Sequence, residues 1–539
     1  MLMGAITKAF FGQDIIKNNT LSFFAIVLSF FFLFYNLGSY PLWDDEALIG
    51  LYAQNILKSG DTSAYFGDNI IAYRGGILLS KGFDRAIPPL ASYVTAASFS
   101  IFGVNAFAAR LPFAMIAFGG IIMSLWILKK HEHFRRYELF FTLSLIGCTP
   151  LFLFSRQCRY YALVIVFSLA IFYLISSGPR GILRMISASF VSVLLFASNY
   201  MNWVVLMAVV VLDFLIFRKY HKTPSLREAA WFFFPQAILI LLIGFIWNPL
   251  QTQFGKYGDM NSVSDRLKLL CWNFRDLDSG GFMPATTLLL IPIFAFLSRD
   301  IWLIRGSICL CLYTSLVALV SPQLVSITNV ADIRYLVAIL PLIIALNTRF
   351  FGRLACQSSW LIKGIVAVLL LTNLMTASFF LKKTFTSHPL NFARELFFPL
   401  PDPFSPTADW FLKHAPQKSS VWIVPDYMAY PLMFRAPHII YAWQLEPSQK
   451  PDPQFRRLAD IHFKGLAMPD YIVAFGPVVQ EVRALCSQWA MQGVCYVEEA
   501  RLLTFWKDLY RPELFWRTFK PIEKFDPNTE AIYIFQKQP

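Results

Sequence analysis

The chain has few charged side chains and few histidines for its length. Charged residues make up only 15% of its 539 residues and histidine occurs 7 times, whereas soluble domains carry about 25% charged residues. Hydrophobic residues make up 56%, so a wholly soluble protein is excluded and a polytopic membrane protein with room for a soluble domain is predicted. The net charge of +14 falls largely in short loops between apolar segments. The positive-inside rule explains that pattern, and no nucleic-acid partner is expected.

The sequence also lacks the cysteine spacing of a metal site. Its 8 cysteines form no C-x-x-C pair and have no histidine at ligand spacing, so a zinc site is not expected. Cys486 and Cys495 are the one pair in the polar C-terminal part. We predict a disulfide between them if that part faces an oxidising compartment. Internal repeats and low-complexity tracts are absent as well.

Apolar segments predict about eleven membrane spans. Residues 88–103 are apolar but short, and we place them in the membrane interface, because the later basic loops then all fall on the cytoplasmic side. The alternative, in which 88–103 crosses the membrane, remains open. The N-terminus is expected in the cytoplasm, and the loops 155–161, 249–281 and 321–333 outside. The expected spans lie near 20–38, 107–128, 138–154, 160–177, 186–200, 202–217, 230–248, 283–298, 305–321, 334–348 and 363–381.

The C-terminal part has a different character. Residues 385–539 alternate strand-like and helix-like patterns after a proline-rich linker, which predicts an extracytoplasmic α/β domain following a transmembrane domain over 1–384. The expected strands are 421–425, 438–443, 471–475, 494–498 and 531–536, and the expected helices are 454–463 and 478–491.

Three adjacent acids, Asp44, Asp45 and Glu46, stand just after the first apolar segment. A helix-like stripe follows them, and Lys58 and Gly60 are stop signals for that helix. The pattern predicts a cluster of carboxylates fixed on a short helix at the membrane surface. Asp44 or Asp45 is suited to cap that helix by accepting its free N–H groups, so capping alone is one interpretation and catalysis is the other.

Arginines and tyrosines gather on the same expected outer face, against the trend of the positive-inside rule. Snorkelling at span ends explains any one of them, but it explains the whole set poorly. Arginine binds phosphate through paired hydrogen bonds, and a carboxylate acts as general base toward a hydroxyl. Cations also stabilise a departing phosphate. Together these groups predict transfer from a lipid phosphate to an acceptor alcohol.

Four sequence blocks resemble membrane glycosyltransferases of the GT-C fold. They are similar to the protein O-mannosyltransferases and the bacterial lipid A aminoarabinose transferases, and the resemblance covers about the first 350 residues. The blocks are Trp-Asp-Asp-Glu-Ala at 43–47, Phe-Gly and Ala-Arg-Leu-Pro within 102–112, Ser-Arg-Gln and Arg-Tyr-Tyr-Ala-Leu within 155–163, and Arg-Tyr-Leu and Leu-Pro-Leu within 334–342.

The resemblance implies a fold of about eleven spans with juxtamembrane helices in the first outer loop, and a polyprenyl-phosphate sugar as donor. The acceptor would be a hydroxyl of an envelope glycan, lipid or protein, lipopolysaccharide included, at the outer face of the bacterial inner membrane. Asp45 would be the general base or would orient the acceptor. The implied catalytic set is Asp45, Asp44 and Glu46; the implied donor-phosphate set is Arg334, Tyr335, Arg159, Arg85 and Arg156; the implied substrate set is Tyr160, Tyr161, Asp84 and Trp43.

The chain departs from its relatives in the 155–161 turn, where many of them carry a second acid and this chain has none. We therefore expect metal-independent transfer without a cofactor. The resemblance also implies inversion at the sugar carbon by one-step displacement. A transporter or flippase of lipid-linked sugars is the alternative, but it would favour mid-span charges and repeated halves. A scaffold protein would not need the mixed acid and arginine cluster.

Overall fold

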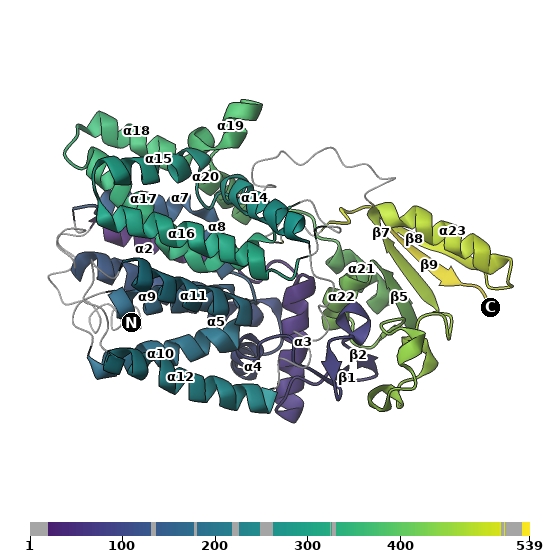
Figure 1. The fold of residues 1–539 in the computed structure, drawn as a ribbon. Helices are drawn as coiled ribbons and strands as arrows, with labels where there is room; N and C mark the ends of the chain where they lie inside the picture. Colours follow the sequence, from purple (N-terminus) through teal and green to yellow (C-terminus); the bar gives the residue numbers. More distant parts are fainter. Residues whose placement is uncertain are drawn as a thin grey trace.

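Figure 1 shows the computed structural model, in which a bundle of helices lies beside a smaller, sheet-containing part. The structure describes residues 20–130, 136–176, 181–217, 226–247, 262–323, 325, 330–507, 511 and 531–539. Helix α3 (Asp44–Ser59) runs across the end of the bundle, between the long helices and the sheet. The acids at its start therefore lie where the two parts meet.

Most of the bundle is built from apolar helices. Four described helices are long and apolar enough to cross a membrane, or up to five if the bent pair α7 and α8 is one span. Each of the eleven predicted segments coincides with a helix or a broken helix, and the number of crossings stays a prediction. The helices are α2 (Thr20–Phe34), α5 (Ala106–Lys130), α7 (Glu138–Gly147), α8 (Thr149–Ser155), α9 (Tyr161–Ser176), α10 (Ile182–Ser198), α11 (Tyr200–Ile216), α12 (Leu226–Trp247), α14 (Val263–Ser279), α15 (Ala285–Leu297), α16 (Ile301–Val320), η2 (Ile333–Ile339), α17 (Leu340–Ala355), α18 (Trp360–Leu371), α19 (Ala377–Lys382) and α20 (His388–Phe397).

Two prolines direct chain segments toward the start of α3. Pro150 lies in the first turn of α8, and Pro341 lies in the first turn of α17, where a missing N–H breaks no helical hydrogen bond. Helices α7 and α8 meet at an angle of 58°, so the chain bends before the 155–161 turn. The 3₁₀ helix η2 similarly precedes α17. Both irregular segments deliver arginines to the same place.

The loop between α2 and α5 is folded rather than extended. It contains α3, two short hairpins and α4 (Leu90–Phe102), which corresponds to the predicted interfacial segment 88–103. The hairpins pair β1 (Tyr65–Phe66) with β2 (Asn69–Ile70), and β3 (Leu79–Ser80) with β4 (Phe83–Asp84). Helix α4 packs against both α3 and α5, so this loop is anchored to the bundle.

The C-terminal part contains a five-stranded sheet in the order β6-β5-β7-β9-β8. The strands are β5 (Ser420–Val424), β6 (Ile440–Tyr441), β7 (Tyr471–Phe475), β8 (Tyr496–Leu502) and β9 (Ile532–Lys537). Strand β5 is parallel to β6 and β7, whereas β9 is antiparallel to β7 and β8. All five predicted strands and the predicted helix 478–491, observed as α23 (Val479–Ala490), are confirmed.

Two sequence-based predictions in this part are wrong. Residues 454–463 form the separate 3₁₀ turns η6 (Pro453–Phe455) and η7 (Asp460–His462) instead of a helix. Their amides bond to carbonyls three residues back, as Phe455 does to Asp452, so no α-helical ladder forms. Cys486 is buried and Cys495 is exposed, and both are free cysteines rather than a disulfide.

The sheet-containing part and the bundle share one hydrophobic core. A continuous cluster of buried side chains extends from Ala25 on α2 to Ile534 on β9. Helix α22 (Ala429–Arg435) packs on α3, and a Cβ at Gly50 would lie 2.9 Å from the Phe434 ring. Only glycine permits this close approach. The C-terminal part therefore supports the helix that carries the acids, while the predicted boundary at 384 stays a prediction.

Candidate active site

The carboxylate of Asp45 lies between two arginines from distant parts of the chain. Its Oδ2 accepts a hydrogen bond from Arg334 Nη1 at 2.6 Å, across 289 residues of sequence. Arg159 Nη2 lies 2.9 Å from the same oxygen. Arg334 also donates Nε–H to Asp332 Oδ2 at 2.8 Å. The predicted base and both main predicted phosphate ligands thus meet at one point.

Asp45 and its arginines are largely shielded from water. The side-chain exposure is 16% for Asp45, 9% for Arg159 and 22% for Arg334. Burial would raise the pKa of Asp45, but the charges of Arg159, Arg334 and Arg511 outweigh that effect and hold it below its usual value. Asp45 is therefore a carboxylate at neutral pH, and it forms ion pairs with both arginines.

Glu46 fixes the start of α3 to its surroundings. Its carboxylate accepts two hydrogen bonds from Arg110, at 2.8 and 2.5 Å, and one from the backbone N–H of Cys158 at 2.7 Å. Arg110 also donates to the carbonyls of Tyr40 and Pro41 at 2.9 Å. Glu46 is completely buried. The geometry makes it a positioning group that ties α3 to the turn carrying Arg159.

Trp43 and Asp44 face the C-terminal part. The indole Nε1–H of Trp43 donates to Gln157 Oε1 at 2.6 Å. Arg511 places its guanidinium 4.8 Å from the centre of the Trp43 ring and 3.5 Å from Asp44 Oδ2. The helix begins at Asp44 with Trp43 as the N-cap, so neither Asp44 nor Asp45 is the capping residue.

Two hydrogen-bond donors near Asp45 have no acceptor among the described residues. They are the hydroxyl of Tyr160 and the Nε–H of Arg159, although Tyr160 is only 7% exposed. Buried donors of this kind are rare without a partner, and both suit an anionic ligand. Tyr161 is fully buried against Phe154, with ring centres 4.9 Å apart, so it supports the turn. The ring of Tyr335 lies against the Arg334 guanidinium at 5.6 Å.

Arg156 does not join the Asp45 cluster. Its Nη1 and Nη2 donate to the carbonyls of Phe32 and Tyr35 at 2.7 and 2.8 Å, and the residue is 6% exposed. Arg156 therefore satisfies the free carbonyls at the end of α2. The predicted phosphate role of Arg156 has no support in this geometry.

Arg85 and Asp84 lie away from Asp45 along α3. Arg85 makes a two-armed ion pair with Asp61 at 2.7 and 2.8 Å, and its guanidinium lies 4.1 Å from the Trp247 ring centre. Asp61 follows the far end of α3, a helix of 16 residues and hence about 24 Å long. Asp84 is buried, accepts a hydrogen bond from Tyr52 at 2.9 Å, and has its pKa raised by burial. Neither residue reaches the Asp45 cluster in this structure.

Sequence reasoning missed one partner of the site and two pairings within it. Asp332 lies two residues before Arg334, and Arg110 belongs to the Ala-Arg-Leu-Pro block, but neither pattern revealed the ion pairs with Arg334 and Glu46. Arg511 had no signal, because it belongs to no motif and reaches Asp44 only through the tertiary fold.

Within the described residues, no group of three or more His, Cys, Asp and Glu side chains gathers as a metal site.

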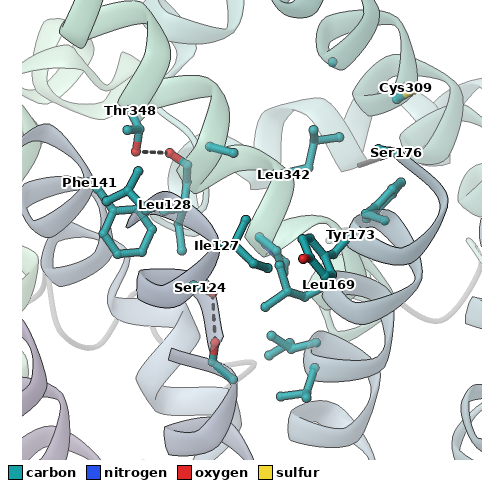
Figure 2. Close-up of a pocket in the computed structure, with 18 of the residues that line it drawn as sticks. Ser124, Ile127, Leu128, Phe141, Leu169, Tyr173, Ser176, Cys309, Leu342 and Thr348 are labelled. Atoms are coloured by element: carbon teal, nitrogen blue, oxygen red, sulfur yellow. Dashed lines mark hydrogen bonds between the residues drawn. The ribbon is translucent and has the colours of Figure 1, made fainter. Parts of the chain in front are cut away.

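A cavity of about 480 Å³ lies deeper in the bundle, between α5, α9 and α17. Figure 2 shows its largely apolar wall, including Leu128, Leu169 and Leu342. Ser124 and Thr348 donate to carbonyls of their own helices, so they offer little polarity to the interior. The cavity is lined by α9 from Ile165 onward and by α17 from Pro341 onward. Arg159 lies two residues before α9, and Arg334 lies on η2, which precedes α17.

Comparisons with known proteins show the fold. The apo crystal structure of ArnT from Cupriavidus metallidurans matches with a TM-score of 0.57 and 13% identity, over 95% of this chain and 97% of that one. The same protein bound to undecaprenyl phosphate matches with a TM-score of 0.53 and 13% identity, over 96% and 98%. No protein-family model and no curated protein sequence matches the chain. The chain thus has the fold of these structures, which is the predicted GT-C fold.

Proposed function

We propose that the protein transfers a sugar from a polyprenyl-phosphate donor to an acceptor hydroxyl of an envelope glycan, lipid or protein. The observation that carries this proposal is the carboxylate of Asp45 held by Arg159 and Arg334, at 2.9 and 2.6 Å. The matching fold of ArnT, one structure of which holds undecaprenyl phosphate, supports a lipid-linked donor. The site would face the outer side of the bacterial inner membrane.

In the proposed reaction, the donor phosphate competes with Asp45 for the two arginines. The phosphate takes over their N–H donors and also uses the free donors of Tyr160 and Arg159. Asp45 then loses part of the positive field that lowers its pKa, and it becomes a stronger base just when the donor is in place. Donor binding would in this way activate the catalytic group.

The chemical step is a single displacement at the sugar carbon. The acceptor oxygen forms a bond to that carbon while the bond from the carbon to the phosphate oxygen breaks. The acceptor proton passes to Asp45, and polyprenyl phosphate leaves with its developing charge stabilised by Arg159 and Arg334. The configuration at the sugar carbon inverts. No metal ion is required in this scheme.

The cavity between α9 and α17 is suited to the polyprenyl chain. Arg159 lies two residues before α9, and Arg334 lies on η2 directly before α17. Both helices line the cavity further along, so the chain of a donor whose phosphate is bound by the two arginines would reach a largely apolar space. A chain of this kind gains free energy by leaving water and does not require specific polar contacts.

The test uses the purified full-length protein in lipid nanodiscs. Undecaprenyl phosphate should bind, and Arg334→Ala should weaken binding about tenfold or more, because a charge-assisted contact is lost. Mass spectrometry of envelope lipids and glycans, with and without the protein in cells, then identifies the transferred mass. Two results together would count against the function. One is that cells expressing active-site variants carry the same envelope glycans as cells expressing the wild-type protein, and the other is that Arg334→Ala binds the lipid as tightly as the wild-type protein does. A transporter would move lipid-linked sugar normally with Asp45→Asn.

A further inference from the structure

Arg334 lies in the first turn of η2, and the segment directly before η2 has no regular secondary structure. Residues 330–332 precede this 3₁₀ helix, which starts at Ile333. The reach of Arg334 toward Asp45 therefore depends on what holds the preceding amides. An error of about 1 Å in the position of such a group reduces catalysis about 100-fold in well-studied enzymes.

Two side chains hold two successive amides of this segment. Asp276 Oδ2 accepts the backbone N–H of Ala331 at 2.7 Å. Gln323 Oε1 accepts the next N–H, that of Asp332, at 2.8 Å. Asp276 is 7% exposed, so its bond to Ala331 is protected from competing water.

Asp276 is itself fixed from two sides. Arg275 binds both carboxylate oxygens, at 2.6 and 2.9 Å. Its helix α14 is tied to α16, because Asn273 donates to the Thr314 carbonyl at 3.2 Å and Arg266 donates to the Ser321 carbonyl at 2.6 Å. A rigid helix thus connects the carboxylate of Asp276 to the rest of the bundle.

We infer that Asp276 is a positioning residue that sets Arg334 for the donor phosphate by holding the Ala331 amide. The inference rests on the proposed function, since it takes the phosphate to be what Arg334 binds. Asp276 does not contact Asp45 or Arg159 in any described interaction. It acts through a chain of contacts from Ala331 through Asp332 to Arg334.

The experiment measures binding of undecaprenyl phosphate to the full-length protein in nanodiscs, together with the thermal unfolding midpoint. Asp276→Ala should weaken binding about tenfold and no more than Arg334→Ala does, because a misplaced Arg334 loses its charge-assisted contact with the phosphate. Asp276→Asn keeps an oxygen that accepts from Ala331, and it should restore binding to within about threefold of wild type. Arg275→Ala keeps the oxygen that accepts from Ala331 but removes the group that fixes the carboxylate, so it should weaken binding less than Asp276→Ala does.

A double-mutant cycle with Arg334→Ala tests whether Asp276 affects binding through Arg334. If Asp276 acts through Arg334, Asp276→Ala adds nothing to the loss caused by Arg334→Ala. A residue that only stabilises the fold would lower the unfolding midpoint of all Asp276 variants and add its effect to that of Arg334→Ala. If Asp276→Ala does not accumulate, Asp276→Ser replaces it, because the shorter serine side chain does not reach Ala331.

The failures of the inference and of the proposed function look different. Normal binding by Asp276→Ala beside weak binding by Arg334→Ala would overturn the inference alone. Additive losses in the double mutant, or a loss in Arg275→Ala as large as in Asp276→Ala, would also overturn it. Normal binding by Arg334→Ala itself would instead remove the phosphate role on which both depend.

Discussion

Asp45→Asn should bind undecaprenyl phosphate more tightly than the wild-type protein does. In the free protein, Asp45 Oδ2 occupies the donors of Arg159 and Arg334 at 2.9 and 2.6 Å, so an incoming phosphate has to displace it. Asparagine keeps the shape but removes the charge, and two arginines are left with a weaker partner. The substitution therefore removes ion pairs that stabilise the unbound protein and that the phosphate would otherwise have to break.

The size of the effect follows from the two contacts. Asparagine still accepts charge-assisted hydrogen bonds from the two arginines, because the guanidinium groups keep their charge. What is lost is the additional attraction of each ion pair, roughly 1–1.5 kcal/mol for partly buried groups, so the two pairs together release roughly 2–3 kcal/mol. Partial exposure of Asp45 and Arg334, at 16% and 22%, reduces this figure through solvent screening. We expect a gain of about 1.4–2.8 kcal/mol, or a 10- to 100-fold lower Kd.

The assay is equilibrium binding of radiolabelled undecaprenyl phosphate to nanodiscs at neutral pH. Sugar transfer by Asp45→Asn should be lost in the same preparation, because the proposed general base is removed. Asp44→Asn is the comparison variant, since the Asp44 carboxylate pairs with Arg511 at 3.5 Å; its Kd should change less than that of Asp45→Asn does. Equal or weaker lipid binding by Asp45→Asn would refute the competition between carboxylate and phosphate.

Three further predictions concern stability, pH and chain length. Glu46→Gln breaks the buried pair with Arg110 and should lower the free energy of unfolding by about 3–5 kcal/mol, seen as a lower unfolding midpoint; an unchanged midpoint would contradict the positioning role. The pKa of Asp45 is lowered, so its stabilising effect is present above its unfolded pKa of about 3.9 and is lost as the pH falls through the folded pKa. Arg159→Gln raises that folded pKa, and acid titration followed by scanning fluorimetry should show stability lost at a higher pH than in wild type. Ala345→Phe partly fills the cavity and should raise KM for a long-chain polyprenyl donor but not for a short-chain analogue; equal effects on both donors would place the chain elsewhere.

The sequence predicted the centre of the site better than its edges. Asp45, Arg159 and Arg334 were singled out because their chemistry fits one reaction, and the fold brings all three to one oxygen atom. Arg85 and Arg156 have the same chemistry and a similar place in the sequence. Arg85 pairs with Asp61 beyond the far end of α3, and Arg156 donates to carbonyls at the end of α2, so neither side chain lies at Asp45.

Long-range pairing explains what was missed. Local patterns predicted each strand of the sheet, since a strand signal is contained within its own residues. The contact between Arg511 and Asp44 joins the C-terminal part to α3, and no local pattern encodes it. The same holds for the hydrogen bond between Asp276 and the Ala331 amide, which no local sequence pattern indicates.

Charge balance links the ion pairs at the site to the proposed reaction. The carboxylates of Asp44, Asp45 and Asp332 face the guanidinium groups of Arg511, Arg159 and Arg334, so these pairs are neutral together. A donor phosphodiester brings one negative charge, and the leaving phosphate monoester carries two at high pH. Because the acceptor proton moves to Asp45, the local charge is the same before and after transfer. The site then does not have to bind reactant and product with different total charge, and the arginines are free to stabilise charge as it shifts from Asp45 to phosphate.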